Sequence, residues 1–188
     1  ASPVGLGARD TLRMEAGLPL YGHEFGNAPD GSPIPIFACL LSRFAVDFDD
    51  STRDFLGRKA LQAQNECARR AAAGHTARCE VLPCRIRPFV VTGRGIPRQA
   101  DQVLIDGREA GVVTSGTVVP YFVGTEDAGE WRPGSETGRR ALGLAMVALD
   151  VTPGSAIDFR VRGRHIQGRI VTRNLDNRKG TYAVPVVP

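Results

Sequence analysis

The spacing of hydrophobic residues changes along the chain, and the change falls near Gly74. Before this point, apolar residues at helical intervals, each set followed by a glycine, predict a short helix over residues 10–16 and a longer helix over residues 55–73. Between the two, an almost uninterrupted apolar run over residues 36–46 predicts a buried strand. The first 75 residues are therefore predicted to form an α+β unit.

In the short helix, Ala8, Leu12 and Ala16 are spaced four residues apart, so they lie on one side and we expect that side to pack inward. Arg9 and Arg13 are also four apart and would project together away from the packed side. Two guanidinium groups beside a glycine-rich backbone can grip carboxylates in a bidentate manner. Ion pairing with acidic neighbours on the helix surface explains the same pattern, and spacing does not decide between the two.

After Gly74 the pattern is typical of short strands joined by turns. The clearest signal is Asp106-Gly107 between two apolar runs, because this dipeptide supplies the positive φ angles of a tight hairpin turn. A second hairpin is expected with its turn at Gly163-Arg164, and a Gly-, Glu- and Pro-rich stretch over residues 125–137 predicts a surface loop. The expected strands cover residues 78–88, 102–105, 108–114, 140–149, 157–162 and 165–172. Six or so antiparallel strands suggest a small barrel or a sandwich.

Composition places the chain among ordinary globular proteins. Its 188 residues allow one or two domains, and 42% hydrophobic with 23% charged residues rules out a disordered or fibrous chain. The longest apolar runs fall far short of the roughly 20 residues that span a bilayer, so no membrane partner is expected.

The positive charge of the chain is concentrated near its C-terminus. The chain carries 24 Lys and Arg against 20 Asp and Glu, and residues 151–188 hold seven of the basic and two of the acidic residues. Five arginines would share the exposed faces of the second hairpin, either as a solvated surface or as a dock for an anion: Arg160, Arg162, Arg164, Arg169 and Arg173. A net charge of +4 is modest for a nucleic-acid binder, and no nucleic acid is expected as a partner.

The four cysteines do not follow a metal-binding spacing. Cys39, Cys67, Cys79 and Cys84 are separated by gaps of 27, 11 and 4 residues, which match no zinc pattern. If residues 78–87 form a strand, Cys79 and Cys84 lie on opposite faces and cannot chelate together. With no disulfide framework and no secretory segment apparent, we expect reduced thiols in a cytoplasmic protein.

Single residues give little sign of a catalytic or metal site. Ser115 lacks the glycine two positions earlier that a nucleophile elbow requires, so we interpret it as a polar strand end. The three histidines are scattered over different elements. Gly5 and Gly7 do not continue into a dinucleotide-binding loop, because Asp10 stands where glycine is needed. Three aspartates within residues 47–50 could hold a cation or act as an acid and base pair, but an acidic turn after a strand is the simpler interpretation.

Three runs of residues carry a resemblance to a known family. Residues 5–24 (GLGARDTLRMEAGLPLYGHE) closely resemble the signature of the T-protein of the glycine cleavage system, an aminomethyltransferase that uses tetrahydrofolate. Residues 54–61 (DFLGRKAL) are similar to the start of a helix in this family, and residues 111–117 (GVVTSGT) to one of its barrel strands. The tail over residues 180–185 (GTYAVP) is similar to a bacterial subgroup in which the T-protein is fused to serine hydroxymethyltransferase.

The resemblance spans nearly the whole chain but corresponds to the C-terminal half of the family. It implies that residues 1–75 are the C-terminal part of a central α/β folate-binding region, followed by a C-terminal antiparallel β-barrel over residues 76–188. The family's catalytic aspartate would lie in the other half, so no catalytic residue is expected in this chain, which we interpret as a fragment. Arg9 is similar to the family's folate-binding arginine, and Tyr182 to a folate-contacting tyrosine near its C-terminus.

The reaction implied by the resemblance moves an aminomethyl group from the lipoyl arm of H-protein to tetrahydrofolate and releases ammonia. The expected partners are therefore lipoylated H-protein and the missing N-terminal half, with tetrahydrofolate as cofactor and no metal. Residues 92–99 and 125–137 differ from common T-proteins, so the one-carbon donor stays open. Two alternatives remain: a related folate-dependent demethylase, and a non-catalytic folate-binding or partner-docking module.

Overall fold

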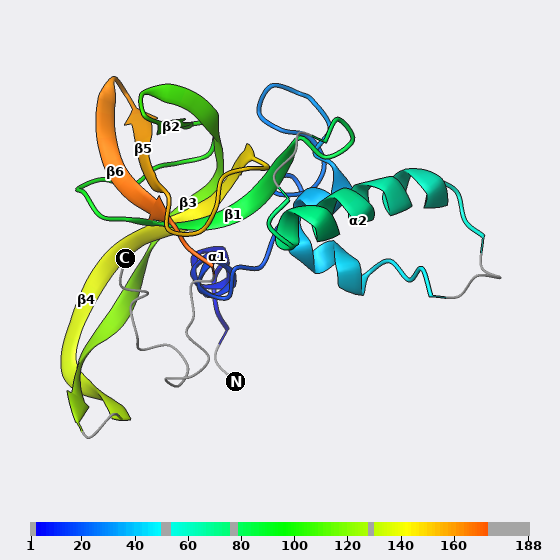
Figure 1. The fold of residues 1–188 in the computed structure, drawn as a ribbon. Helices are drawn as coiled ribbons and strands as arrows, with labels where there is room; N and C mark the ends of the chain where they lie inside the picture. The colour runs from blue at the N-terminus through cyan, green and yellow to red at the C-terminus, as the bar shows by residue number, and fades with distance from the viewer. Residues whose placement is uncertain (1–2, 50–53, 76–78, 128–129, 173–188) are drawn as a thin grey trace.

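The six strands close into a barrel in the order β1-β4-β3-β2-β5-β6, and each neighbouring pair is antiparallel (Figure 1). The structure, a computed structural model, describes residues 3–49, 54–75, 79–127 and 130–172. The strands are Cys84–Val91 (β1), Gln102–Ile105 (β2), Arg108–Asp127 (β3), Glu130–Ala148 (β4), Ala156–Val161 (β5) and Arg164–Ile170 (β6). The predicted α+β fold is confirmed, and its strands form a barrel rather than a sandwich.

The barrel is filled by its own cluster of buried hydrophobic side chains. Phe89 of β1 and Phe159 of β5 meet at its centre, with ring centroids 4.5 Å apart. Because side chains alternate along a strand, residues two apart in the barrel, such as Ile157 and Phe159, point into this cluster together. The buried members are Phe89, Val103, Val113, Ala145, Val147, Val151, Ile157, Phe159, Ile166 and Ile170.

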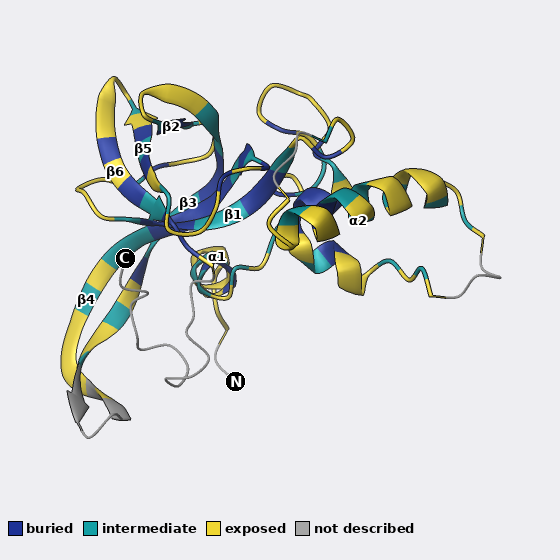
Figure 2. Ribbon diagram, viewed as in Figure 1, coloured by how far each residue is buried: buried dark blue, intermediate teal, exposed yellow. Residues whose placement is uncertain are grey.

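A second apolar cluster joins the outside of the barrel to the N-terminal elements. It combines Met14 of helix α1 (Leu6–Glu15), Ala68 of helix α2 (Arg58–Ala72) and outward-facing barrel residues such as Val90 and Leu142. Figure 2 shows this buried layer in dark blue between the barrel and the helices, whereas the outer side of α2 is exposed. The N-terminal elements are thus held against one side of the barrel. No helix among the described residues is long and apolar enough to cross a membrane.

The two predicted helices and both predicted hairpins are present. The short helix begins one turn earlier than expected, at Leu6, and the long helix ends before Gly74 as predicted. At the first hairpin, Asp106 and Gly107 have φ angles of 50° and 75°, so both adopt the left-handed conformation that the turn requires. The second turn lies one residue earlier than expected, at Arg162 and Gly163.

The prediction of a buried strand over residues 36–46 is wrong. This segment forms two 3-10 helices, Ile36–Ala38 (η1) and Leu40–Phe44 (η2), and the Ser42 hydroxyl donates a hydrogen bond to the Ile36 carbonyl across them. A short apolar run satisfies the burial needs of a strand and of a helical turn equally well, so its periodicity does not separate the two.

The prediction of a surface loop over residues 125–137 is also wrong. Strands β3 and β4 continue past the barrel as a two-stranded ribbon, with Gly124 paired to Pro133 and Asp127 paired to Glu130. Figure 1 shows this ribbon extending away from the barrel at the lower left. Both strands of such a ribbon are edge strands, which tolerate proline and need no buried face. The loop-like composition therefore did not exclude pairing.

We expected all four cysteines to be reduced thiols, and this is wrong for Cys67 and Cys79. Cys67 of α2 and Cys79 form a disulfide with their Cα atoms 6.4 Å apart, while Cys39 and Cys84 are free. We also expected Cys79 and Cys84 to lie on one strand, and this is wrong, because β1 begins only at Cys84. Sequence spacing alone does not reveal which of four cysteines meet, because the meeting depends on how α2 packs beside the segment leading into β1.

Candidate functional site

Helix α1 lies on the outside of the barrel against β3 and β4 (Figure 1). The side that faces the barrel carries Arg13, which is 8% exposed, and Met14, which is completely buried. Ala8, Leu12 and Ala16 are exposed, so the expectation that they form the packed side is wrong. The helix buries Arg13 instead of its row of alanine and leucine side chains, because the surrounding polar groups accept hydrogen bonds from the guanidinium.

The guanidinium of Arg13 is surrounded by oxygen acceptors. Its Nε donates to Asp10 Oδ1 at 2.8 Å and its Nη1 to Glu24 Oε2 at 3.2 Å, and Nη1 also reaches the Leu18 carbonyl at 3.3 Å. Its Nη2 donates to Ser115 Oγ on β3 at 3.0 Å. The Glu24 side chain is fully buried, so this ion pair is shielded from solvent. Arg13 therefore attaches the helix to the barrel.

The hydrogen bonds around Ser115 argue against a nucleophilic serine. Its Oγ donates to Glu24 Oε1 at 2.6 Å, and that carboxylate is already neutralised by Arg13. The nearby His23 places Nδ1 3.0 Å from the Thr114 carbonyl, which can only accept, so this nitrogen carries the proton and is no base toward Ser115. Ser115 is 4% exposed and lies within β3, not at a strand end as we had interpreted it. The cluster is therefore structural.

Arg9 behaves differently from Arg13. The structure separates the two arginines that we expected to project together: Arg13 is ion-paired and buried, whereas Arg9 is exposed on the outer side of α1. No hydrogen bond or ion pair joins its side chain to a described residue. Leu6 and Leu12 lie three residues before and after it on the same side, and they are 79% and 56% exposed. Within the part of the chain that the structure describes, Arg9 is thus an exposed cation without a partner, flanked by exposed apolar side chains.

The backbone beside Arg9 leaves room for a ligand. A Cβ atom added to Gly5 or to Gly7 would meet nothing within 4 Å, so the space over the first turn of α1 is open. Tyr182, the other residue expected to contact folate, lies outside the described residues. The arrangement offers a guanidinium fork that can bind a carboxylate, set among side chains that can cover an apolar ligand.

The remaining candidates from the sequence do not assemble into a second site. Asp47 Oδ1 accepts a hydrogen bond from the backbone N–H of Asp49 at 2.9 Å, which fits the predicted acidic turn, and Asp50 lies outside the described residues. No group of His, Cys, Asp or Glu among the described residues is arranged to hold a metal ion. In the second hairpin Arg160 donates to Gln102 Oε1 at 2.8 Å. Arg162 and Arg164 are exposed, Arg169 is half-buried and Arg173 lies outside the described residues.

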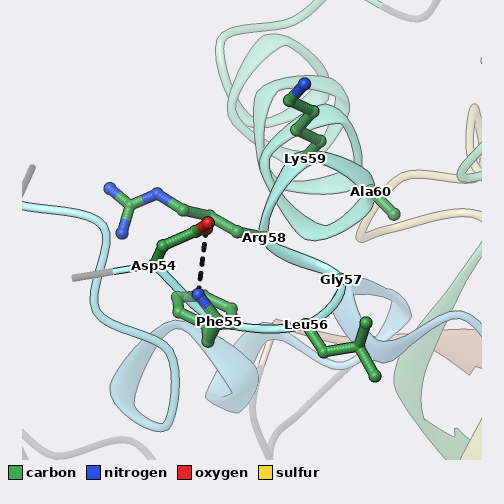
Figure 3. A pocket seen from close by; sticks show the side chains of 7 residues that line it. All are labelled: Asp54, Phe55, Leu56, Gly57, Arg58, Lys59 and Ala60. Atoms are coloured by element: carbon green, nitrogen blue, oxygen red, sulfur yellow. Dashed lines mark hydrogen bonds between the residues drawn. The ribbon is translucent and has the colours of Figure 1, made fainter.

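An open hollow at the start of α2 lacks converging polar groups. Residues 54–60 line it, and their side chains point in different directions in Figure 3. Asp54 Oδ1 accepts a hydrogen bond from the adjacent Phe55 N–H, and Arg58 Nη2 donates to the Phe48 carbonyl at 3.0 Å. Leu56 is fully exposed and Lys59 points away from Arg58. We therefore place the candidate ligand site at Arg9.

Sequence reasoning missed the Arg13, Glu24 and Ser115 cluster. Arg13 and Ser115 are 102 residues apart, and nothing in their local spacing predicts contact. One signal was present: Arg13 and Glu24 lie in the first run that resembles the T-protein, and Ser115 lies in the third. Polar residues shared by separate motifs of one family are candidates for a common network.

The barrel and the helix packed on it define the class of fold, which is that of the glycine cleavage T-proteins. Among solved structures, the chain is similar to the glycine cleavage system aminomethyltransferase T from Bartonella henselae, with a TM-score of 0.60. The similarity covers 96% of this chain and 41% of that chain at 20% sequence identity, which shows the fold alone. No family model matches the chain.

Sequence comparison extends the relationship. An aminomethyltransferase of Moorella thermoacetica is 39% identical over 171 residues, covering 90% of this chain and 36% of the relative. That of Rubrobacter xylanophilus is 36% identical over 179 residues, covering 95% and 38% respectively. The chain is therefore homologous to the C-terminal part of the aminomethyltransferases, and the resemblance inferred from its motifs is confirmed. It spans little more than a third of the length of these relatives.

Proposed function

We propose that the chain provides the folate-binding helix and the C-terminal barrel of an aminomethyltransferase of glycine cleavage. In this proposal residues 1–75 belong to the folate-binding region and residues 76–188 to the barrel domain. The complete enzyme would transfer the aminomethyl carbon of lipoylated H-protein to tetrahydrofolate and release ammonia. The observation that carries the proposal is the exposed guanidinium of Arg9, which has no partner among the described residues, on a helix whose other arginine is fixed to the barrel.

The chemistry of the site fits a folate. The glutamate end of a folate carries carboxylates, which a guanidinium binds through charge-assisted hydrogen bonds. Leu6 and Leu12 can cover apolar parts of the same ligand, and we keep Tyr182 as a second contact in the proposal. Arg13 contributes indirectly, because its attachment to Glu24 and Ser115 fixes the orientation of α1 and hence the direction of Arg9.

We propose that Ser115, His23 and Arg9 do not move a proton during the transfer. Ser115 and His23 are committed to the structural cluster, and the guanidinium of Arg9 offers N–H donors but no acceptor. We therefore propose that the catalytic acid and base come from the part of the enzyme that the chain does not span. That part would also complete the binding site for the carrier protein.

The proposal can be tested with a chimera. The C-terminal part of the Moorella thermoacetica relative is replaced by this chain, and formation of methylenetetrahydrofolate from aminomethyl-loaded H-protein is measured. We expect turnover by the folded chimera and none by the 188 residues alone. Appreciable turnover by the chain alone would contradict the division of labour, and a folded chimera that binds folate without turnover would favour a non-catalytic module.

We place the complete enzyme in the cytoplasm as part of this proposal. The Cys67–Cys79 disulfide makes the location testable, because the cytosol keeps most thiols reduced. Thiols are blocked by alkylation in intact cells before lysis, and the chain is analysed by mass spectrometry. Alkylation of both Cys67 and Cys79 would agree with a reducing compartment, whereas a Cys67–Cys79 pair protected in the cell would contradict it.

A further inference from the structure

Strand β1 carries two arginines on the side that faces the barrel core. Arg85 and Arg87 alternate along the strand with the same period as Phe89, which is a buried member of the core cluster. On the neighbouring strand β4 they pair with Val147 and Ala145, which belong to the same cluster. Two guanidinium groups therefore extend from a face that otherwise carries apolar side chains.

Neither arginine has a partner among the described residues. Arg85 is 2% exposed, and the Nε atoms of Arg85 and Arg87 are both shielded from solvent without a hydrogen-bond acceptor. No salt bridge joins either side chain to a described carboxylate. This differs from the cluster around Arg13, where each nitrogen of the guanidinium has an oxygen acceptor.

The electrostatic surroundings of the pair show the same lack of a counter-charge. Burial, together with the smaller effect of the neighbouring charge of Arg85, lowers the pKa of Arg87 to about 10. Burial alone lowers the pKa of Arg85. The pKa of Arg140 is also lowered by burial, but there the carboxylate of Glu15 acts in the opposite direction. At neutral pH both arginines of β1 remain protonated and repel each other.

A buried charge is costly unless an opposite charge or hydrogen-bond acceptors satisfy it. Guanidinium groups cannot escape this cost by losing their protons at neutral pH. Arg85 and Arg87 are two residues apart on one face of β1, so their Cα atoms are about 6.6 Å apart. Their flexible side chains can therefore converge on one group. A planar fork of N–H donors matches the oxygens of a carboxylate or a phosphate.

The pairing of β1 leaves this end of the strand open on one side. The last residue pair between β1 and β6 is Phe89 with Ile170, and one further hydrogen bond joins Val171 N to the Pro88 carbonyl. Arg87 and Arg85 lie beyond this point, where β1 is paired only to β4 among the described strands. We take this edge of β1 as the route by which an anion reaches the two arginines.

We propose that Arg85 and Arg87 form a binding site for a small oxyanion, a carboxylate or phosphate group, at the end of the barrel where β1 begins. This site is separate from Arg9, because α1 packs on the outside of the barrel while both arginines of β1 face inward. Its ligand neutralises the two cations and accepts hydrogen bonds from the Nε atoms, which have no acceptor among the described residues. The site does not depend on the proposed folate function.

Melting temperatures of the 188-residue chain test the proposal. Sodium phosphate or sodium acetate replaces sodium chloride at constant ionic strength and pH, in the wild type and in the variants Arg85→Met, Arg87→Met and Arg94→Met. Arg94 is the control, because it is an exposed arginine in the loop that follows β1. We expect a rise that grows with the logarithm of the anion concentration and reaches about 3–10 °C in the wild type at ten to a hundred times the dissociation constant of the anion.

The two inner variants should lose this rise, and the control should keep it. In chloride alone, Arg85→Met should melt at or above the wild-type temperature, because it removes an uncompensated buried charge. A response to phosphate alone would identify a phosphate site, and a response to acetate would identify a carboxylate site. Equal responses in all variants, or no response of the wild type to either anion, would overturn the proposal.

A second measurement covers the case in which a variant does not fold. The Nε–H signals of arginines labelled with 15N are followed by NMR in the wild-type chain during titration with phosphate and with acetate. Two shielded Nε–H signals should shift together and saturate, while the signals of exposed arginines change little. The absence of any saturable shift in the shielded signals would overturn the proposal even without the variants.

Discussion

Arg13 of α1 donates a 3.0 Å hydrogen bond to Ser115 of β3, although the two residues are 102 positions apart in the sequence. The completely buried carboxylate of Glu24 binds both of them. A helix that lies on the outside of a barrel is in this way attached to a barrel strand through charged and polar groups. The same attachment determines which side of α1 remains free, and Arg9 lies on that side.

The first prediction concerns the energy of this attachment. Replacing Glu24 by Gln should lower the free energy of unfolding by about 3–5 kcal/mol, because it leaves the buried guanidinium of Arg13 with one carboxylate fewer. Asp10 also binds Arg13 but is 43% exposed, so Asp10→Asn is the matched control and should cost less than about 1 kcal/mol. Urea denaturation measures both. Equal small losses would mean that the buried cluster does not hold the helix.

The second prediction concerns the disulfide. Without reductant, a thiol reagent should titrate two cysteines in the denatured chain, Cys39 and Cys84, and four after reduction. The double variant Cys67→Ser/Cys79→Ser should lose about 2–3 kcal/mol of stability under non-reducing conditions, since the bond closes a loop with a sequence separation of 12. Under reducing conditions the variant and the wild type should have similar stability. Four reactive thiols without reductant would refute the bond.

The third prediction concerns the thiol of Cys84. Burial raises its pKa from 9.0 to about 11, so the folded state retains a proton that the unfolded chain releases at lower pH. In a Cys39→Ser background, alkylation by iodoacetamide at pH 8 should be at least about 100-fold slower in the folded than in the unfolded chain, because only the thiolate reacts.

The same pKa shift has a consequence for stability. Below pH 9 the thiol is protonated in both states and contributes no pH dependence. As the pH rises from about 9 toward 11, the unfolded state loses the proton first, so the free energy of unfolding should fall. The fall is measured as the difference between the Cys39→Ser chain and a Cys39→Ser/Cys84→Ala chain, which cancels other titrating groups. An unchanged difference across this range would contradict the raised pKa.

The sequence signals that predicted the fold correctly were local. Asp106-Gly107 predicted a hairpin because only a few residue types adopt two consecutive left-handed conformations at low cost. The long helix over residues 58–72 was found from its spacing and the glycine after it. In each case the residues that decide the structure lie within one element, so no tertiary information was needed.

The signals that failed depended on tertiary contacts. The apolar run over residues 36–46 forms two 3-10 helices that bury Phe37 and Ala38 but leave Leu40 and Phe44 exposed. The strands over residues 125–127 and 130–137 pair although their composition is that of a loop. The inward side of α1 was assigned to Leu12 because leucine is apolar. Arg13 takes that place because two residues outside the helix accept hydrogen bonds from its guanidinium. Glu24 lies in the loop after the helix, and Ser115 is remote in the sequence.

The same limit applies to the candidate site. Arg9 was identified from a resemblance and not from spacing, since Arg9 and Arg13 were equivalent in the sequence pattern. The structure distinguishes them by burial: one guanidinium is enclosed by acceptors and the other is exposed. The buried pair Arg85 and Arg87 carried no signal at all, because an Arg-x-Arg spacing in a strand is ordinary for a solvated face and becomes unusual only when that face is found inside a barrel.

The most direct test of the proposed function is the affinity of the chimera for a stable tetrahydrofolate analogue, measured by isothermal titration calorimetry. A charge-assisted hydrogen bond contributes roughly 1.5–3 kcal/mol, so Arg9→Ala should weaken binding about ten- to a hundredfold. Arg9→Lys should recover part of the loss, because it keeps the charge without the planar fork. Arg70→Ala, which removes an exposed arginine of α2, should bind like the wild type. Unchanged affinity in a folded Arg9→Ala protein would contradict the proposal that Arg9 binds folate.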